Sequence, residues 1–152
     1  MQKLCGLQLL NVEKANATLP RTLERRADFA CIGIDAKTLE RILSHLEFQS
    51  KCDTKMDSRM LFYYALFYDL YRIPVRQYVI YLGSGDWTAP RGIIHGKLNF
   101  SYEVIVLNKI DYQTFVNSEE PEEIILAILA DFKGKNNAKV IQQIITCLRD
   151  EK

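Results

Sequence analysis

The chain of 152 residues is 48% hydrophobic and 26% charged, values that are typical of a globular protein and exclude a wholly disordered chain. Its length predicts one domain over residues 1–152, and its net charge of +1 excludes a protein that binds nucleic acid through bulk charge alone. No apolar run approaches the ~18 residues of a membrane-spanning helix, and the four cysteines lack the spacing of a metal finger. We therefore expect a cytoplasmic protein that enters no membrane, with reduced and mostly buried thiols.

The first elements of the chain are predicted to be strands. Residues 6–13 favour a short strand, and a turn follows at residues 16–20. Residues 28–34 and 42–49 both alternate with the period of two that is typical of strands. Because the polar connection at residues 35–41 is short, we expect these two strands to pair as an antiparallel hairpin.

The register of this hairpin decides whether two acidic residues meet. Opposed residues share a constant sum of residue numbers, and contact of Asp28 with Glu47 on one face requires an odd sum. A loop centred on residues 37–38 predicts a sum of 75, with 77 as the alternative. An even sum of 76 would place Phe48 opposite Asp28 and turn Glu47 to the other face.

A helix is predicted after the hairpin. Asp53 is its expected N-cap, and methionine and aromatic residues recur at helical spacing up to Pro74. These aromatic residues favour core packing against the sheet, and a base-stacking platform for single strands is the alternative. Arg59 and Tyr63 lie one turn apart, so their polar ends either reach the two acids or a phosphate, or form a surface salt bridge.

The rest of the chain completes a mixed α/β (α+β) pattern. Residues 75–82 predict a central strand, residues 83–96 a glycine-containing loop, and residues 102–107 a further strand. Residues 121–132 predict a helix that begins at a proline. A last amphipathic helix at residues 140–148 either covers the sheet or serves as a partner surface.

The two acidic motifs predict a divalent-metal site. Asp28 on one strand and Glu47 on the next supply the one or two carboxylates that Mg²⁺ usually takes. The backbone carbonyl of Phe48 is a candidate third oxygen, and Gln49, on the Glu47 face, is a candidate to orient a bound water. Such a site would serve phosphodiester cleavage with Mg²⁺, or with Mn²⁺ or Ca²⁺ as alternatives.

Basic residues lie close to these acids. Residues 1–97 carry 14 Lys and Arg against 10 Asp and Glu, whereas residues 98–152 carry 6 against 9. This excess forms either a phosphate-facing rim or a solvated face. The candidates for supporting the site or contacting a phosphate are Arg25, Arg26, Arg59 and Tyr63. Glu24 is a candidate extra ligand, and His45 either assists proton transfer or is a structural, hydrogen-bonded histidine.

The sequence also resembles a known family at these residues. The matching segments are residues 19–28 (LPRTLERRAD), 45–49 (HLEFQ), 56–60 (MDSRM) with Tyr63, 73–75, 79–82 and 122–132. Together they are similar to the recombination-promoting nuclease and transposase-like family of the PD-(D/E)XK nuclease superfamily, over most of the chain.

The resemblance implies a restriction-endonuclease-like core, a mixed sheet flanked by helices, with metal-dependent DNA endonuclease activity. It implies that Asp28 and Glu47 are metal ligands and that Gln49 stands where lysine is usual. DNA is then the expected partner, and a homodimer is left open. Members usually carry a longer N-terminal helical segment before the first strand, which this chain is expected to lack.

Two other classes of function remain as alternatives. The first is a binding or assembly module that keeps the nuclease fold and cuts nothing. The second is a structural α/β domain in which Asp28 and Glu47 only form ion pairs with Arg25, Arg26 or Arg59.

Overall fold

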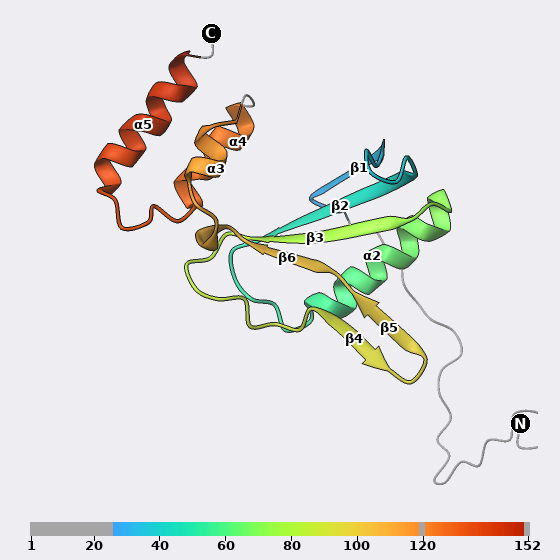
Figure 1. Ribbon diagram of the computed structural model, residues 1–152. Coiled ribbons are helices and arrows are strands. Elements are labelled where there is room, and N and C mark those ends of the chain that lie inside the picture. Colours follow the sequence, from blue (N-terminus) through green and yellow to red (C-terminus); the bar gives the residue numbers. More distant parts are fainter. Residues whose placement is uncertain (1–25, 119–120, 151–152) are drawn as a thin grey trace, which may run out of the picture.

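The centre of the computed structural model, which describes residues 26–118 and 121–150, is a four-stranded sheet (Figure 1). Its strands, in the order in which they lie side by side, are β1 (Phe29–Ile34), β2 (Arg41–Gln49), β3 (Val75–Tyr81) and β6 (Glu103–Val106). β1 is antiparallel to β2, whereas β2, β3 and β6 are parallel to one another. The expected mixed α/β fold and the central place of β3 are therefore confirmed. The predicted strand at residues 6–13 lies outside the described residues.

Helix α2 (Met56–Tyr71) joins β2 to β3 and packs against the sheet (Figure 1). Met56, Met60 and Tyr63 are its buried residues, spaced so that they lie on one face of the helix. Core packing therefore accounts for the methionine and aromatic residues in the first half of the helix. Tyr68 and Tyr71 near its end are about half exposed, at 46% and 48%.

The N-terminus of α2 differs from the prediction. Lys55 occupies the N-cap position and makes no side-chain capping bond. Asp53 lies two residues earlier, where its carboxylate accepts the Lys55 amide at 2.9 Å and an arginine of the helix at 3.4 Å. The aspartate therefore stabilises the turn before the helix rather than capping the helix itself.

The segment predicted as one long loop contains half of a second, two-stranded sheet. β4 (Gly92–His95) pairs with β5 (Leu98–Ser101) in an antiparallel hairpin whose turn includes Gly96 at φ 58°. Trp87, in the preceding loop, is buried and packs edge-on against Tyr81. The strand predicted at residues 102–107 begins one residue later and is shorter, as β6.

The C-terminal elements form a second hydrophobic cluster that lies apart from α2 (Figure 1). It is built from α3 (Gln113–Val116), α4 (Pro121–Leu126), η2 (Ala127–Leu129) and α5 (Asn137–Asp150), and η1 (Leu107–Lys109) leads into it from β6. The helix predicted at residues 121–132 is therefore too long, because the chain tightens into a 3₁₀ turn after Leu126. The last helix is confirmed, and it packs against α4 and η2 rather than on the sheet.

The cysteine prediction needs one correction. Cys31, Cys52 and Cys147 are free thiols, but Cys31 is exposed and the other two are half-buried, so none of these three is a core residue. Cys5 lies outside the described residues. None of the described helices is long and apolar enough to cross a membrane.

Candidate active site

The β1–β2 hairpin brings the two predicted acids together. Phe29 pairs with Leu46 and Ala30 with His45, so the partner sum is 75 and the predicted odd register is confirmed. Just before β1, the Asp28 amide donates to Glu47 Oε1 at 3.2 Å, and the Phe48 amide donates to Asp28 Oδ2 at 2.8 Å. The two carboxylates are therefore neighbours at the end of the hairpin.

The two carboxylates lie in different environments. Asp28 is exposed, whereas Glu47 is 3% exposed and is the one buried acid among the described residues. Glu47 Oε1 accepts from His45 Nε2 at 3.1 Å, and Oε2 accepts from Arg59 Nη2 at 3.0 Å. Burial raises the pKa of Glu47, but hydrogen bonds from His45 and the Asp28 amide, with the Arg59 charge, outweigh it and lower the pKa below 4.5. Glu47 is therefore ionised at neutral pH.

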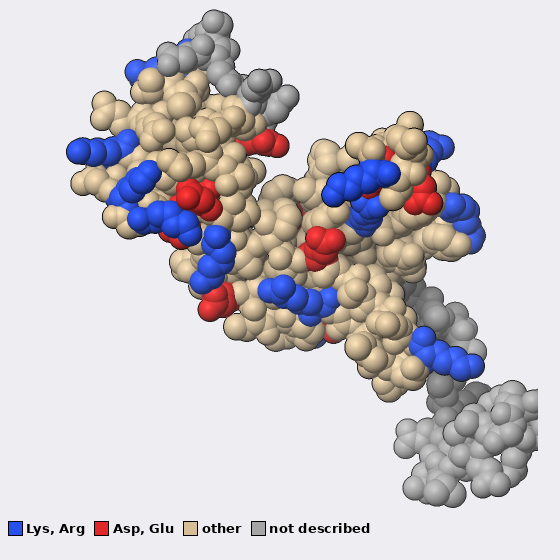
Figure 2. Space-filling view, in the orientation of Figure 1, with Lys and Arg blue, Asp and Glu red and all other residues tan. Residues whose placement is uncertain are grey.

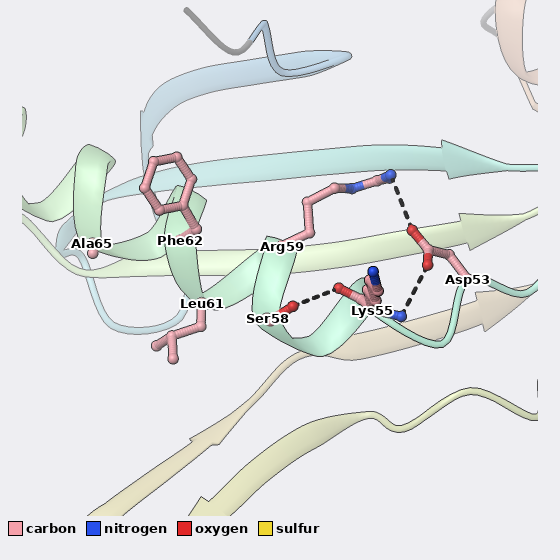
Figure 3. Close-up of a pocket in the computed structure, with 7 residues that line it drawn as sticks. All are labelled: Asp53, Lys55, Ser58, Arg59, Leu61, Phe62 and Ala65. Carbon is pink, nitrogen blue, oxygen red and sulfur yellow. Dashed lines mark hydrogen bonds and ion pairs between the residues drawn. The ribbon is translucent and has the colours of Figure 1, made fainter. Parts of the chain in front are cut away.

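Arg59 links this carboxylate to helix α2. Its Nη1 donates to Asp53 at 3.4 Å while Nη2 holds Glu47, and its Nε is buried without a partner in the described part of the chain. Figure 3 shows the side chain extending from α2 toward Asp53, with Ser58 and Lys55 beside it in the first turn. The predicted contact of Arg59 with the acids is thus present for Glu47, and it is partly buried rather than a surface salt bridge.

A polar recess of about 390 Å³ opens at the two acids. Its walls are formed by seven residues: Arg26, Asp28, Glu47, Phe48, Gln49, Arg59 and Tyr63. The Tyr63 hydroxyl donates to the Arg26 carbonyl at 3.0 Å, which ties the segment before β1 to helix α2. Six of these residues were predicted for the site by side chain and Phe48 by its carbonyl. Of the three other candidates, Arg25 and Glu24 lie outside the described residues, and His45 is buried behind the recess, where it contacts Glu47.

Gln77 is the residue that sequence reasoning missed. It lies on β3 directly beside His45 in the parallel register, is 6% exposed, and contacts His45 Nδ1 through its Nε2 at 3.0 Å. The available signal was an uncharged amide on the strand face that Gln77 shares with Val75 and Val79, where a buried polar side chain needs a partner.

The recess supplies some of the oxygen ligands that a hard cation such as Mg²⁺ takes. Two adjacent carboxylates are what Mg²⁺ commonly takes from a protein, and Asp28 Oδ1 makes no hydrogen bond within the described residues. Glu47 Oε2 accepts one hydrogen bond and keeps a second acceptor position. Among residues 26–118 and 121–150, no group of three or more His, Cys, Asp and Glu side chains is arranged to hold a metal. The two acids therefore fit a metal that also takes water or phosphate oxygens.

A second, larger hollow of about 710 Å³ lies on the α2 side of Arg59 (Figure 3). Asp53, Lys55 and Ser58 line its polar part, and Leu61, Phe62 and Ala65 line the rest. Arg59 lines both hollows, so a ligand that extends from one to the other passes a guanidinium group.

Comparison with protein-family models, with curated proteins and with solved structures finds no match for this chain. The family resemblance described above therefore stays a prediction, and the chemistry of the recess carries the functional argument.

Proposed function

We propose that this protein is a metal-dependent DNA endonuclease of the recombination-promoting nuclease type, with a restriction-endonuclease-like core. The observation that carries the proposal is the meeting of Asp28 and Glu47 across the β1–β2 hairpin, in an open polar recess that Gln49 also lines. A buried carboxylate next to an exposed one is costly for a fold to keep without a use.

Asp28 and Glu47 are the residues that would hold Mg²⁺, with the Phe48 carbonyl as a third oxygen. Glu47 suits this role because its lowered pKa keeps it deprotonated, as a metal ligand must be. When bound, the metal would supply an activated water and neutralise charge on the phosphate. Gln49 would orient that water through its amide, without adding charge.

Basic side chains near the recess would bind the DNA backbone. Arg26 and Arg59 line the recess itself, and Lys55 with Arg59 lines the larger hollow beside it. On the face drawn in Figure 2, basic and acidic side chains are interspersed over the sheet and the C-terminal helices. Phosphate binding is therefore proposed to rest on this local group of three residues rather than on a broad basic face. A DNA substrate and the free thiols suit a cytoplasmic protein.

A binding module that cuts nothing is the second candidate function. It is favoured by the Arg59 guanidinium, which already neutralises Glu47, and by Gln49 in place of a charged residue. In such a module the same recess would bind a phosphate group, and the two acids would serve the fold.

Nicking of supercoiled plasmid DNA with Mg²⁺, Mn²⁺ or Ca²⁺ separates these candidates. We expect nicking by the unmodified protein to depend on the metal and to fall at least about 100-fold in both Asp28→Asn and Glu47→Gln. Matched controls are Asp69→Asn on α2 and Glu103→Gln on β6, two exposed acids outside the recess. Retarded migration of DNA without nicking would instead support the binding module. Nicking that survives unchanged in both recess variants would overturn the nuclease proposal.

A further inference from the structure

The three buried polar or charged side chains of the described residues form one connected chain. They are His45, Glu47 and Gln77, with exposed fractions of 0%, 3% and 6%. Gln77 Nε2 contacts both the Met60 carbonyl and His45 Nδ1, each at 3.0 Å, and His45 Nε2 contacts Glu47 Oε1 at 3.1 Å. The chain thus runs from the backbone of α2, across β3 and β2, to the acid of the recess.

The backbone carbonyl at the start of this chain fixes every hydrogen in it. Since the Met60 carbonyl can only accept, the amide nitrogen of Gln77 must face it. The second hydrogen of that nitrogen then points at His45 Nδ1, which must be the acceptor. A neutral imidazole with Nδ1 as acceptor carries its proton on Nε2 and donates it to Glu47.

The other end of the Gln77 amide supports this assignment. Gln77 Oε1 is buried and has no partner within the described residues. Reversing the amide would set that oxygen against the Met60 carbonyl oxygen, two acceptors at hydrogen-bond distance. The fold leaves one oxygen unpaired because the nitrogen is required on the other side.

Aromatic rings and charged groups complete the surroundings of His45. The rings of Tyr63 and Phe67 lie 4.8 Å and 5.0 Å from the imidazole, both from α2. Glu47 faces it directly, and the guanidinium of Arg59 lies on the far oxygen of that carboxylate. Two rings of α2 therefore pack against the imidazole, and both of its ring nitrogens are in hydrogen bonds.

We propose that Gln77 and His45 are positioning residues. Gln77 occupies Nδ1 of His45, which keeps the imidazole in the Nε2–H form. His45 in turn holds Glu47 with Oε1 turned inward and Oε2 turned toward the recess. His45 then acts as a fixed donor, and it is not a proton-accepting base, because Gln77 occupies its one acceptor nitrogen. The role of Glu47 as a metal ligand rests on the proposed function, whereas the hydrogen-bond chain does not.

Nuclear magnetic resonance of the full chain with ¹⁵N-labelled histidine tests the proposal. The chain has two histidines, and the second, His95, is exposed on β4 and serves as an internal reference. We expect His45 to show a protonated Nε2 and an unprotonated Nδ1 near neutral pH. In Gln77→Met, which keeps the size of the side chain and removes the donor to Nδ1, we expect a changed ¹⁵N shift of His45 Nδ1 and roughly ten-fold weaker Mn²⁺ binding by calorimetry.

Ile144→Ala is the control, because Ile144 is fully buried in the C-terminal cluster and not in the core between α2 and the sheet. It should lower stability and leave both the Nδ1 shift of His45 and Mn²⁺ binding unchanged. A wild-type His45 with the proton on Nδ1 would overturn the proposal even if no variant folds. So would an unchanged Nδ1 shift in Gln77→Met. If the wild type shows the Nε2–H form but binds no Mn²⁺, the positioning chain stands and the proposed function fails.

Discussion

The recess region and the C-terminal helical cluster are built in opposite ways. The core between α2 and the sheet encloses a chain of three polar side chains that ends at Glu47. The C-terminal core of Tyr112, Val116, Ile124, Ala127, Val140 and Ile144 includes no buried charge among the residues that the structure describes. Buried polar groups lower stability unless they are paired, and the pairing of these three side chains sets the first region apart. The proposed function assigns the chemistry to that region and packing to the second.

The largest loss of stability is expected when one fully buried side chain is removed from either core. Ile144→Ala and Met60→Ala each remove a fully buried side chain and should each lower the free energy of unfolding by about 3 kcal/mol. Only Met60→Ala should also shift the His45 resonances, because the cavity it leaves lies in the core at the residue of α2 whose backbone carbonyl accepts from Gln77. Urea unfolding and the histidine spectrum measure both quantities. An equal shift of His45 in Ile144→Ala would show that the two regions are coupled.

Removal of the Arg59 charge should produce the next largest effect. In Arg59→Met the pKa of Glu47 rises, because burial then acts with less compensation. The lowered pKa of Glu47 in the folded state stabilises the protein above the unfolded value of about 4.5, and this stabilisation disappears as pH falls through the folded pKa. We expect a loss of about 2 kcal/mol at neutral pH that shrinks as the pH falls below 4.5, the value of the carboxyl in the unfolded state.

Urea unfolding across this pH range, with Arg91→Met as an exposed control, checks the prediction. An equal loss in Arg59→Met at neutral and acidic pH would mean that its side chain contributes packing and not charge.

A smaller effect is expected from a lysine at position 49, which compares an added charge in the recess with the same charge in the C-terminal cluster. Gln49 lines the recess, and a positive charge there should assist a developing negative charge on the substrate. We expect Gln49→Lys to nick plasmid DNA roughly ten-fold faster. Gln142→Lys adds the same charge to the exposed face of α5 in the C-terminal cluster. The same gain in both variants would point to bulk attraction of DNA rather than to the recess.

The smallest effect concerns the turn that sets the hairpin register. Leu39 has φ 59° and is 78% exposed, so glycine should relieve backbone strain there. We expect Leu39→Gly to stabilise the protein by about 0.5 kcal/mol in thermal or urea unfolding. Leu70→Gly, exposed within α2, should do the reverse by about 1 kcal/mol. Destabilisation by Leu39→Gly would show that this turn carries no strain.

The elements that could be predicted from the sequence are those set by local patterns. The alternation in β1 and β2 and the short connection between them gave the register that joins Asp28 to Glu47. Helix α2 followed from the spacing of Met56, Met60 and Tyr63. In each case a period in the sequence matches the geometry of one element.

The remainder depended on contacts between distant residues. Gln77 gains its role only because β3 lies parallel to β2 and places it beside His45. The β4–β5 hairpin lacked a strong turn pair, so its strands resembled a loop. Asp53 looked like a helix cap, but Arg59, one turn into the helix, also uses its carboxylate. Contacts between residues far apart in the sequence produce no local periodic pattern, so they could not be predicted from it.

The most direct test of the central claim is a titration of the histidine-labelled protein with Mn²⁺, whose paramagnetism broadens nearby resonances. A metal held by Asp28 and Glu47 should broaden the signals of His45, which contacts Glu47, and leave those of the exposed His95 sharp. Asp28→Asn should abolish the broadening of His45. Broadening of His95 alone, or no broadening of His45 in the wild type, would contradict a metal site in the recess.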